Sequence, residues 1–259
     1  MIAATLIMFL IAIAISSVNG SKALYDKCNL GQIGKALEND KVLHHKYHHL
    51  YCKEFMPFIN GIKDRPIRML EIGFGCGHHN HGTSAIMWNK FFTSNDAQLQ
   101  LYEVDLKQSS HEECVKKFLT QYPPGTIVED VYLGDQGNKD FMRNVVEQSG
   151  GKYDLIIDDG GHRGPLIRNS FEVLWDHLVD GGVYIIEDLG MMPSKFLEES
   201  FVRDILGWQD QLTGLNFKFP DKTDVEWTKF PSVLPKGLVE IHCRNEICAL
   251  VKELDVAKA

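Results

Sequence analysis

The stretch that decides the fold runs Arg68-Met-Leu-Glu-Ile72 and then Gly73-Phe-Gly75-Cys-Gly77. Its first half is an apolar run of strand length, and closely spaced glycines after a strand allow a tight turn and a close approach of the backbone to a ligand. Dinucleotide-binding folds have a similar loop, usually spaced Gly-X-Gly-X-X-Gly. Here the spacing is Gly-X-Gly-X-Gly, and an acid, Glu71, stands two residues before the first glycine. The stretch therefore predicts a ligand site at the carboxyl end of a parallel strand.

Beyond this loop, short apolar runs alternate with amphipathic segments, which predicts a doubly wound α/β sheet with helices between parallel strands. The chain ends differently, because 238–243 and 247–251 follow each other with only a short polar turn between them, as in an antiparallel hairpin. The expected strands of the parallel part are 68–72, 99–104, 127–133, 153–157 and 182–186, and the expected helices are 82–92, 110–121, 139–148 and 166–178.

Three segments are expected along the 259 residues: a leader at 1–20, a helical lead-in at 21–62 and one large folded domain at 63–255. Within that domain, 194–237 begins as a helix and becomes irregular, so it forms either a cap over the site or an ordinary surface excursion. The net charge is −8 and there is no long basic run, which argues against a nucleic-acid partner.

The leader contains an uncharged apolar run from Ile2 to Ile15, followed by small and polar residues in which Val18 and Gly20 fit a signal-peptidase cut. The run is short for a membrane span, which needs about 20 apolar residues. We expect a cleaved signal peptide; an uncleaved membrane anchor and a buried helix are the alternatives. A cleaved signal peptide and an uncleaved anchor would each place the protein in the secretory pathway or outside the cell.

Six cysteines permit disulfides without the density of a disulfide scaffold. Cys243 and Cys248 flank the polar turn of the expected hairpin, so they either face each other as a disulfide or remain two free buried thiols. Cys76, inside the glycine loop, is expected to be a packing residue.

Acidic residues follow the fourth and fifth expected strands, in Asp158-Asp159-Gly160-Gly161-His162 and in Glu187-Asp188. Adjacent parallel strands end at the same edge of a sheet, so four carboxylates and an imidazole are expected to converge. That much negative charge in a cleft is unfavourable without a cation, and oxygen ligands suit Mg²⁺, Mn²⁺ or Ca²⁺. His162 stands near enough to take a proton from a metal-bound hydroxyl. The alternative is that these acids only cap helices and turns.

Two further acids follow the second and third expected strands. A carboxylate at Asp105 can accept hydrogen bonds from both hydroxyls of a ribose. Asp135 and Gln136 are placed to reach an adenine, although residues of this type also simply form turns.

With these motifs in place, the sequence resembles the metal-dependent macrolide-sugar O-methyltransferases of the macrocin and mycinamicin type, which are related to the cephalosporin hydroxylase family. The likeness spans roughly 47–189 and includes Met87-Trp88-Asn-Lys-Phe91-Phe92 and Gly181-Gly-Val-Tyr-Ile-Ile-Glu187-Asp188-Leu189. It departs from that family at Gly161, where the motif usually has Ser, and at His78-His-Asn-His81, which replaces a glycine-rich loop. The secretory leader is also not typical of those bacterial enzymes.

The resemblance implies a Rossmann-like methyltransferase sheet that uses S-adenosylmethionine and Mg²⁺ or Mn²⁺. It implies that Asp159, Glu187 and Asp188 bind the metal and that His162 is the general base. The cofactor-binding residues expected on this basis are Glu71, Gly73, Gly75, Gly77, Ser84, Asp105, Asp135, Gln136 and Asp158.

Two histidine groups stand outside these motifs. His78, His79 and His81 flank the glycine loop, and this position is sufficient to explain their presence. A soft-metal site is the alternative. The group from His44 to His49 recurs at helical spacing, either on a solvated helix face or lining the acceptor pocket.

The predicted function is methyl transfer to a hydroxyl of a sugar, a glycoside, or another polyol or phenol, so the partner is a small molecule or glycan. A nicotinamide-dependent oxidoreductase is one alternative, against which the glycine spacing and the acidic cluster argue. A catalytically silent secreted binding protein of the same fold is another, against which the intact set of Asp159, His162, Glu187 and Asp188 argues.

Overall fold

The computed structural model describes residues 27–76, 81–190, 200–214 and 233–255, so the leader lies outside the described residues. The helices are α2 (Leu30–Ala36), α3 (Asp40–Leu43), α4 (His48–Gly61), α5 (Thr83–Ser94), α6 (Ser109–Gln121), α7 (Lys139–Ser149), α8 (Gly164–Leu174) and α9 (Val202–Thr213), with a 3₁₀ turn at Trp175–His177. The strands are β1 (Ile67–Ile72), β2 (Leu99–Asp105), β3 (Asp130–Leu133), β4 (Tyr153–Asp158), β5 (Leu178–Ile186), β6 (Leu238–Arg244) and β7 (Ile247–Lys252).

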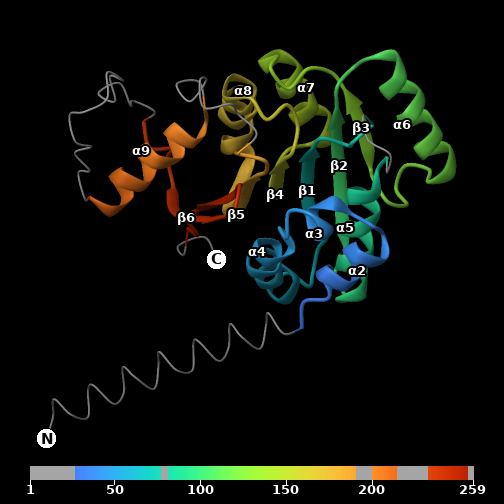
Figure 1. The fold of residues 1–259 in the computed structure, drawn as a ribbon, viewed down its shortest axis with the longest axis horizontal. Helices are drawn as coiled ribbons and strands as arrows, with labels where there is room; N and C mark the ends of the chain where they lie inside the picture. Colours follow the sequence, from blue (N-terminus) through green and yellow to red (C-terminus); the bar gives the residue numbers. More distant parts are fainter. Residues whose placement is uncertain (1–26, 77–80, 191–199, 215–232, 256–259) are drawn as a thin grey trace, which may run out of the picture.

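The described strands form one seven-stranded sheet in the order β3-β2-β1-β4-β5-β7-β6 (Figure 1). Strands β1 to β5 pair in parallel, whereas β7 is antiparallel to both β5 and β6. This confirms the predicted doubly wound sheet with a terminal antiparallel hairpin. Asp158 pairs with Ile72 on one side and with Ile186 on the other, so β1, β4 and β5 end level with one another.

The two faces of the sheet are buried against different helices. Alternate residues of the strands point to opposite faces, which gives two hydrophobic clusters. One cluster contains Met69, Leu101 and Ile157 and packs against α2, α4, α5 and α6. The other contains Leu70 and Ile156 and packs against α7, α8 and α9. By the same alternation, Glu71, Glu103 and Glu187 belong to the face that the N-terminal helices cover.

The predicted bounds agree with the structure to within two residues except for the helix over 166–178, the strand over 127–133 and the strand over 182–186, which begins at Leu178. The expected helix over 166–178 ends at Leu174, and Leu178 already pairs with Tyr153 in the sheet. Trp175 and Leu178 are buried after the helix ends, so their apolar spacing mimicked a longer helix. The strand expected over 127–133 begins only at Asp130, because a turn closed by the Gly125 N–H to the Val128 carbonyl precedes it.

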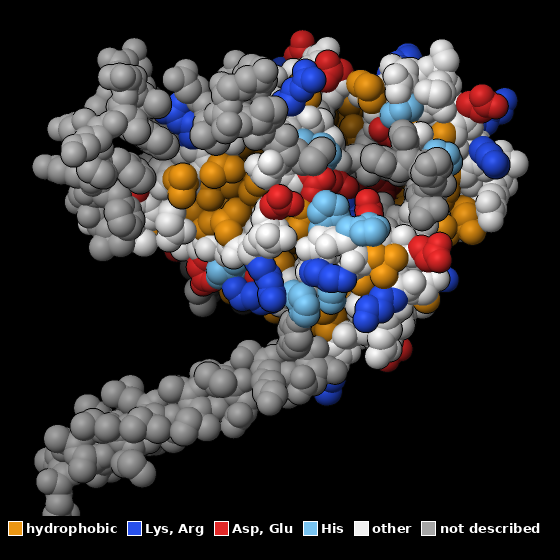
Figure 2. Space-filling model, viewed as in Figure 1, with side chains coloured by type: hydrophobic (Ala, Val, Ile, Leu, Met, Phe, Trp, Pro, Cys, Tyr) orange, Lys and Arg blue, Asp and Glu red, His pale blue; other side chains and the backbone are white. Residues whose placement is uncertain are grey.

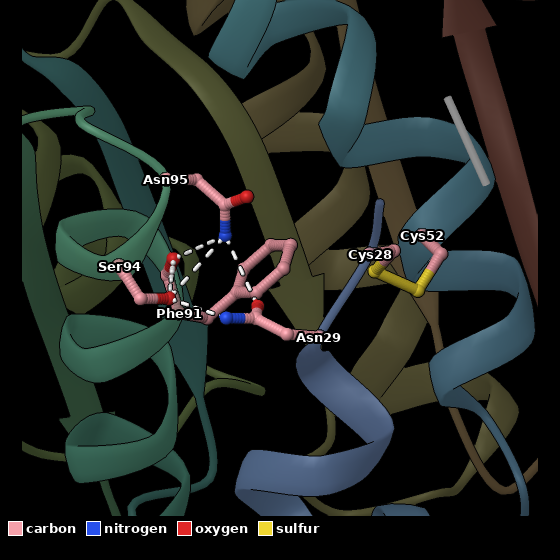
Figure 3. The surroundings of a disulfide bond; sticks show 6 residues. All are labelled: Cys28, Asn29, Cys52, Phe91, Ser94 and Asn95. Carbon is pink, nitrogen blue, oxygen red and sulfur yellow. Dashed lines mark hydrogen bonds between the residues drawn. A yellow bond between two sulfur atoms is a disulfide. The ribbon is translucent and has the colours of Figure 1, made fainter. Parts of the chain in front are cut away.

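The helical lead-in is fastened to the domain at its start (Figure 3). A disulfide joins Cys28, next to α2, to Cys52 in α4. The side chain of Asn29 donates to Ser94 Oγ at 2.8 Å and accepts from Asn95 at 3.1 Å, at the end of α5. Leu30, Leu50 and Phe55 of the lead-in also belong to the hydrophobic cluster that contains Met69 and Leu101, so the described part of the lead-in shares the core of the sheet.

All six cysteines are paired. The Cys243–Cys248 disulfide links β6 to β7, which confirms the disulfide rather than the free-thiol interpretation. Cys76, expected as a packing residue, instead forms a disulfide with Cys114 in α6, because the glycine loop lies against that helix with a Cα–Cα distance of 5.9 Å.

Part of the segment 194–237, expected either as a cap or as a surface excursion, is described. Helix α9 packs through Trp208 against Phe171 and Phe201, on the face that α8 covers. This helix is therefore a surface element of the second face, and most of the remaining stretch from 194 to 237 lies outside the described residues. In the described part of the chain, every helix is too short or too polar to cross a membrane.

Candidate active site

The acidic residues after β4 and β5 surround a lysine from the lead-in. Lys41 Nζ lies 2.8 Å from Glu187 Oε1 and 3.5 Å from Glu71 Oε1, and it contacts Asp159 Oδ2. Lys41, Glu71 and Glu187 are buried, whereas Asp159 is partly exposed. The ammonium of Lys41 thus connects the ends of β4 and β5 to the acid that precedes the glycine loop.

The electrostatics of this contact favour a charged lysine. Burial by itself lowers the pKa of Lys41, but the charges of Asp159, Glu187 and Glu71 outweigh it and hold the pKa well above its usual value. Burial and the charge of Asp159 nevertheless raise the pKa of Glu187. One ammonium therefore does not compensate all of the negative charge gathered here.

Three more side chains of the lead-in face the same cluster. The Tyr47 hydroxyl donates to Asp188 Oδ1 at 2.6 Å, and the Tyr51 hydroxyl donates to Glu187 Oε1. His45 Nδ1 lies 3.6 Å from Asp188 Oδ1, while the neighbouring His44 is exposed. The expected histidine face is therefore divided, since His45 belongs to the site.

Three residues of the site were not predicted from the sequence: Lys41, Tyr47 and Tyr51. A usable signal was the stripe Tyr47, Tyr51 and Phe55 at helical spacing, because buried tyrosine hydroxyls need a hydrogen-bond partner. Nothing in a single sequence marks Lys41 among the other basic residues.

His162, the predicted general base, lies at the outer side of the cluster. Its Nε2 is 3.9 Å from Asp188 Oδ2, and the imidazole is partly exposed. His162 and Asp188 both have positive φ angles, of 49° and 54°. Such angles cost of order 1 kcal/mol or more for a residue with a side chain, and they gather at functional sites.

Among the described residues, the predicted metal ligands fall into three candidate groups, of which one consists of His45, Asp188 and Glu246 and the other two share Asp159. An inner group consists of Glu71, Asp159 and Glu187, and an outer group consists of Asp159, His162 and Asp188. The candidate ligand atoms within each group lie within 4.8 Å of one another. Figure 2 shows histidine and acidic side chains gathered near the middle of this face. Carboxylate oxygens with an imidazole nearby fit a hard divalent cation. The Lys41 ammonium contacts all three members of the inner group, Glu71, Asp159 and Glu187.

Asp158 does not join this cluster, so the expectation that four carboxylates converge is wrong for this residue. Its side chain accepts from Ser170 at 2.6 Å, from Gln136 at 3.1 Å and from Tyr184 at 3.2 Å. Because successive residues of a strand point to opposite faces, Asp158 is buried beneath α8 while Asp159 faces the lead-in.

The predicted ribose ligand, Asp105, lies beside the glycine loop. Its Oδ2 accepts from the Cys76 N–H at 3.3 Å, and its Oδ1 lies 3.2 Å from His111 Nδ1. Gly73 has a φ of 108°, and a Cβ there would come within 2.2 Å of the Asp159 carbonyl. Glycine is thus required for the loop after β1 to approach the loop after β4.

Several predicted cofactor residues have structural partners. Gln136 donates to Asp158 and accepts from the Gly161 N–H at 2.6 Å, which fixes the loop after β4. The exposed Asp135 accepts from the Gly137 N–H, as in the turn that was its alternative interpretation. Ser84 hydrogen-bonds to Glu71. Contacts of these residues with a cofactor stay predictions.

The described part of the glycine loop ends at Cys76, so Gly77, His78 and His79 lie outside the described residues. Gly75 has a φ of 82°, which favours glycine. His81 Nδ1 lies 3.4 Å from the Gly75 carbonyl, so this histidine flanks the loop as expected.

A further buried acid, Glu103, was also not predicted from the sequence. It pairs with Glu71 across β1 and β2, and both of its oxygens lack a hydrogen-bond partner other than Glu71. Burial and then the charge of Glu71 raise the pKa of Glu103 well above its usual value, which favours its neutral form.

Residues 70–189 match a family described as a methyltransferase domain. Over 143 residues the chain is 29% identical to mycinamicin VI 2''-O-methyltransferase of Micromonospora griseorubida and 31% identical to L-olivosyl-oleandolide 3-O-methyltransferase of Streptomyces antibioticus. Each match covers 54% of this chain and 32% of the relative, so the chain matches about a third of the length of these curated relatives.

The fold is also shared with a solved structure. MycE methyltransferase from the mycinamycin biosynthetic pathway, in complex with Mg, SAH and mycinamycin VI, superposes with a TM-score of 0.65 at 21% identity. The superposition covers 88% of this chain and 54% of that one. Residues 70–189 thus match a methyltransferase-domain family, and the chain shares its fold with a solved methyltransferase.

Proposed function

We propose that this protein is an S-adenosylmethionine-dependent O-methyltransferase, assisted by Mg²⁺, that acts on a hydroxyl of a sugar, a glycoside, or another polyol or phenol. The observation that carries the proposal is the outer group of Asp159, His162 and Asp188, at the sheet edge where the glycine loop begins. The relatives are named as O-methyltransferases of mycinamicin VI and of L-olivosyl-oleandolide, which supports a hydroxyl acceptor on a small molecule.

The methyl donor would bind along the ends of β1, β2 and β3. The positive φ angles of Gly73 and Gly75 give a tight turn, which would let the backbone approach the methionine end of the cofactor. Asp105 is placed to accept hydrogen bonds from the ribose, since its carboxylate already orders the start of the glycine loop through Cys76.

Asp159 and Asp188 of the outer group would hold the metal, which when bound would lower the pKa of a coordinated hydroxyl, while Glu187, the third predicted ligand, is paired with Lys41. The chain's own residues then orient and deprotonate the acceptor. Tyr47 fixes the Asp188 carboxylate, and the His162 imidazole accepts the proton of the hydroxyl. S-adenosylmethionine, when bound, would supply the methyl group: its carbon–sulfur bond would break as the carbon–oxygen bond to the acceptor forms, with S-adenosylhomocysteine as the leaving group.

Cofactor binding tests this assignment. We expect S-adenosylhomocysteine to bind the full chain, and Asp105→Ala to weaken that binding by about 10- to 100-fold, because hydrogen bonds to a charged group contribute about 1.5–3 kcal/mol. Isothermal titration calorimetry measures this, with Asp140→Ala, an exposed aspartate in α7, as the control. Undiminished affinity in Asp105→Ala would remove the ribose role. Binding of NAD(P) in place of S-adenosylhomocysteine would favour the oxidoreductase.

We also propose that the protein enters the secretory pathway and loses residues 1 to about 20. The apolar leader supports this, and so do the three disulfides, because disulfides persist in oxidising compartments. N-terminal sequencing of the protein made in a eukaryotic host is expected to begin near Ser21. An intact Met1 on a soluble cytosolic product would contradict the proposal, and a retained leader on membrane-bound protein would favour the anchor.

A further inference from the structure

Lys41 is the residue whose position the proposed reaction does not by itself explain. It belongs to a short helix, α3, and its side chain is almost completely buried in contact with three carboxylates from three different strand ends. Its partners Asp159 and Glu187 are 118 and 146 residues away along the chain. The contact therefore joins the lead-in to the interior of the predicted metal site.

The inner group would be unfavourable without a cation. Glu71 and Glu187 are 0% and 1% exposed, and burying carboxylates without a partner is costly. Further polar contacts come from Tyr51 to Glu187 and from Ser84 and Trp88 to Glu71, and these donors are neutral. Of the described side chains that contact the inner group in these ways, Lys41 is the one that carries a positive charge.

The Lys41 ammonium contacts Asp159, Glu71 and Glu187, so Asp159 is the residue that it has in common with the outer group of Asp159, His162 and Asp188. Lys41 contacts Oδ2 of Asp159 and Oε1 of Glu187, whereas Asp188 faces Tyr47, His45 and His162. Two cation positions thus share the Asp159 carboxylate, and the Lys41 ammonium lies at the inner position.

We propose that Lys41 is a positioning residue whose ammonium serves as a built-in cation for Glu71, Asp159 and Glu187. It holds Asp159 and Glu187 in place before a metal binds and confines the divalent cation to the outer position, beside Asp159 and Asp188. Only the second of these roles rests on the proposed function.

The test replaces Lys41 by a neutral side chain of similar length. In Lys41→Met we expect the melting temperature of metal-free protein to fall by on the order of 10 °C, because an uncompensated buried charge is strongly destabilising. Mn²⁺ should then raise the melting temperature more in the variant than in the wild type, since the inner group becomes available to the ion. Lys35→Met, at an exposed position in α2, is the matched control and should behave as the wild type.

A second substitution separates charge from packing and also covers a variant that folds poorly. In the wild-type background, Glu71→Gln removes a partner of Lys41 and should lower the metal-free melting temperature. In Lys41→Met, the same Glu71→Gln change removes an unbalanced negative charge and should raise it or restore folding. This reversal of sign is a coupling that loss of packing does not produce.

Three results would overturn the proposal: an unchanged melting temperature in metal-free Lys41→Met, equal stabilisation of variant and wild type by Mn²⁺, or the same effect of Glu71→Gln in both backgrounds. None of these measurements uses a cofactor or an acceptor. A failure to bind S-adenosylhomocysteine would therefore refute the proposed function without touching this test.

Discussion

Replacing His162 by alanine is expected to lower kcat by about 10²- to 10⁴-fold, the usual loss when a general base is removed. The imidazole lies at the outer side of the acidic cluster, 3.9 Å from Asp188, where an acceptor hydroxyl can reach it. The measurement is methyl transfer to a panel of sugars, glycosides and catechols, with Mn²⁺ binding followed in parallel. His177→Ala, an exposed histidine just before β5, is the matched control and should keep full activity.

The Mn²⁺ titration decides what His162 does. If it acts as the base, the variant should bind Mn²⁺ with nearly unchanged affinity while turnover falls. Simultaneous loss of Mn²⁺ binding would instead make His162 a metal ligand, which the composition of the outer group allows. Unchanged turnover would assign the proton transfer to another group.

Removing the divalent cation with excess EDTA is expected to abolish methyl transfer and to leave S-adenosylhomocysteine binding largely intact. The reason is spatial: the expected cofactor residues Gly73, Gly75, Asp105 and Asp135 lie at or after the ends of β1, β2 and β3, whereas the outer group of Asp159, His162 and Asp188 follows β4 and β5. Activity should return when Mg²⁺ is added in excess over the chelator. Asp159→Ala should reproduce the loss without EDTA, because this carboxylate belongs to both the inner and the outer group.

Full methyl transfer in excess EDTA would contradict the metal mechanism. The acidic cluster would then need a structural explanation, and the ion pairs of Lys41 with Asp159 and Glu187 would supply it. Stability measurements on Lys41→Met distinguish these cases independently, because they are made without acceptor.

The order of secondary structure was predictable because it follows from local patterns. An apolar run at Tyr153–Asp158 has the length of a strand buried on both faces, and a polar turn between two apolar runs, as at Cys243–Cys248, gives a hairpin. One error arose where a buried apolar residue continued a pattern past the end of an element, as Leu178 did after α8, and another where a turn at 125–128 took up the start of the strand expected over 127–133.

The sequence by itself determined the parallel sheet and the acids at its carboxyl edge, since parallel strands end level and the motifs follow β1, β2, β4 and β5 directly. Which acids share a face, and what neutralises them, was decided by tertiary structure. Asp158 and Asp159 are neighbours in the chain but lie on opposite faces, because side chains alternate along a strand. Lys41 and Tyr51 reach Glu187 from 146 and 136 residues away, and the Cys76–Cys114 disulfide spans 38. Contacts at such separations depend on how the helices pack against the sheet, and no local pattern in one sequence encodes that packing.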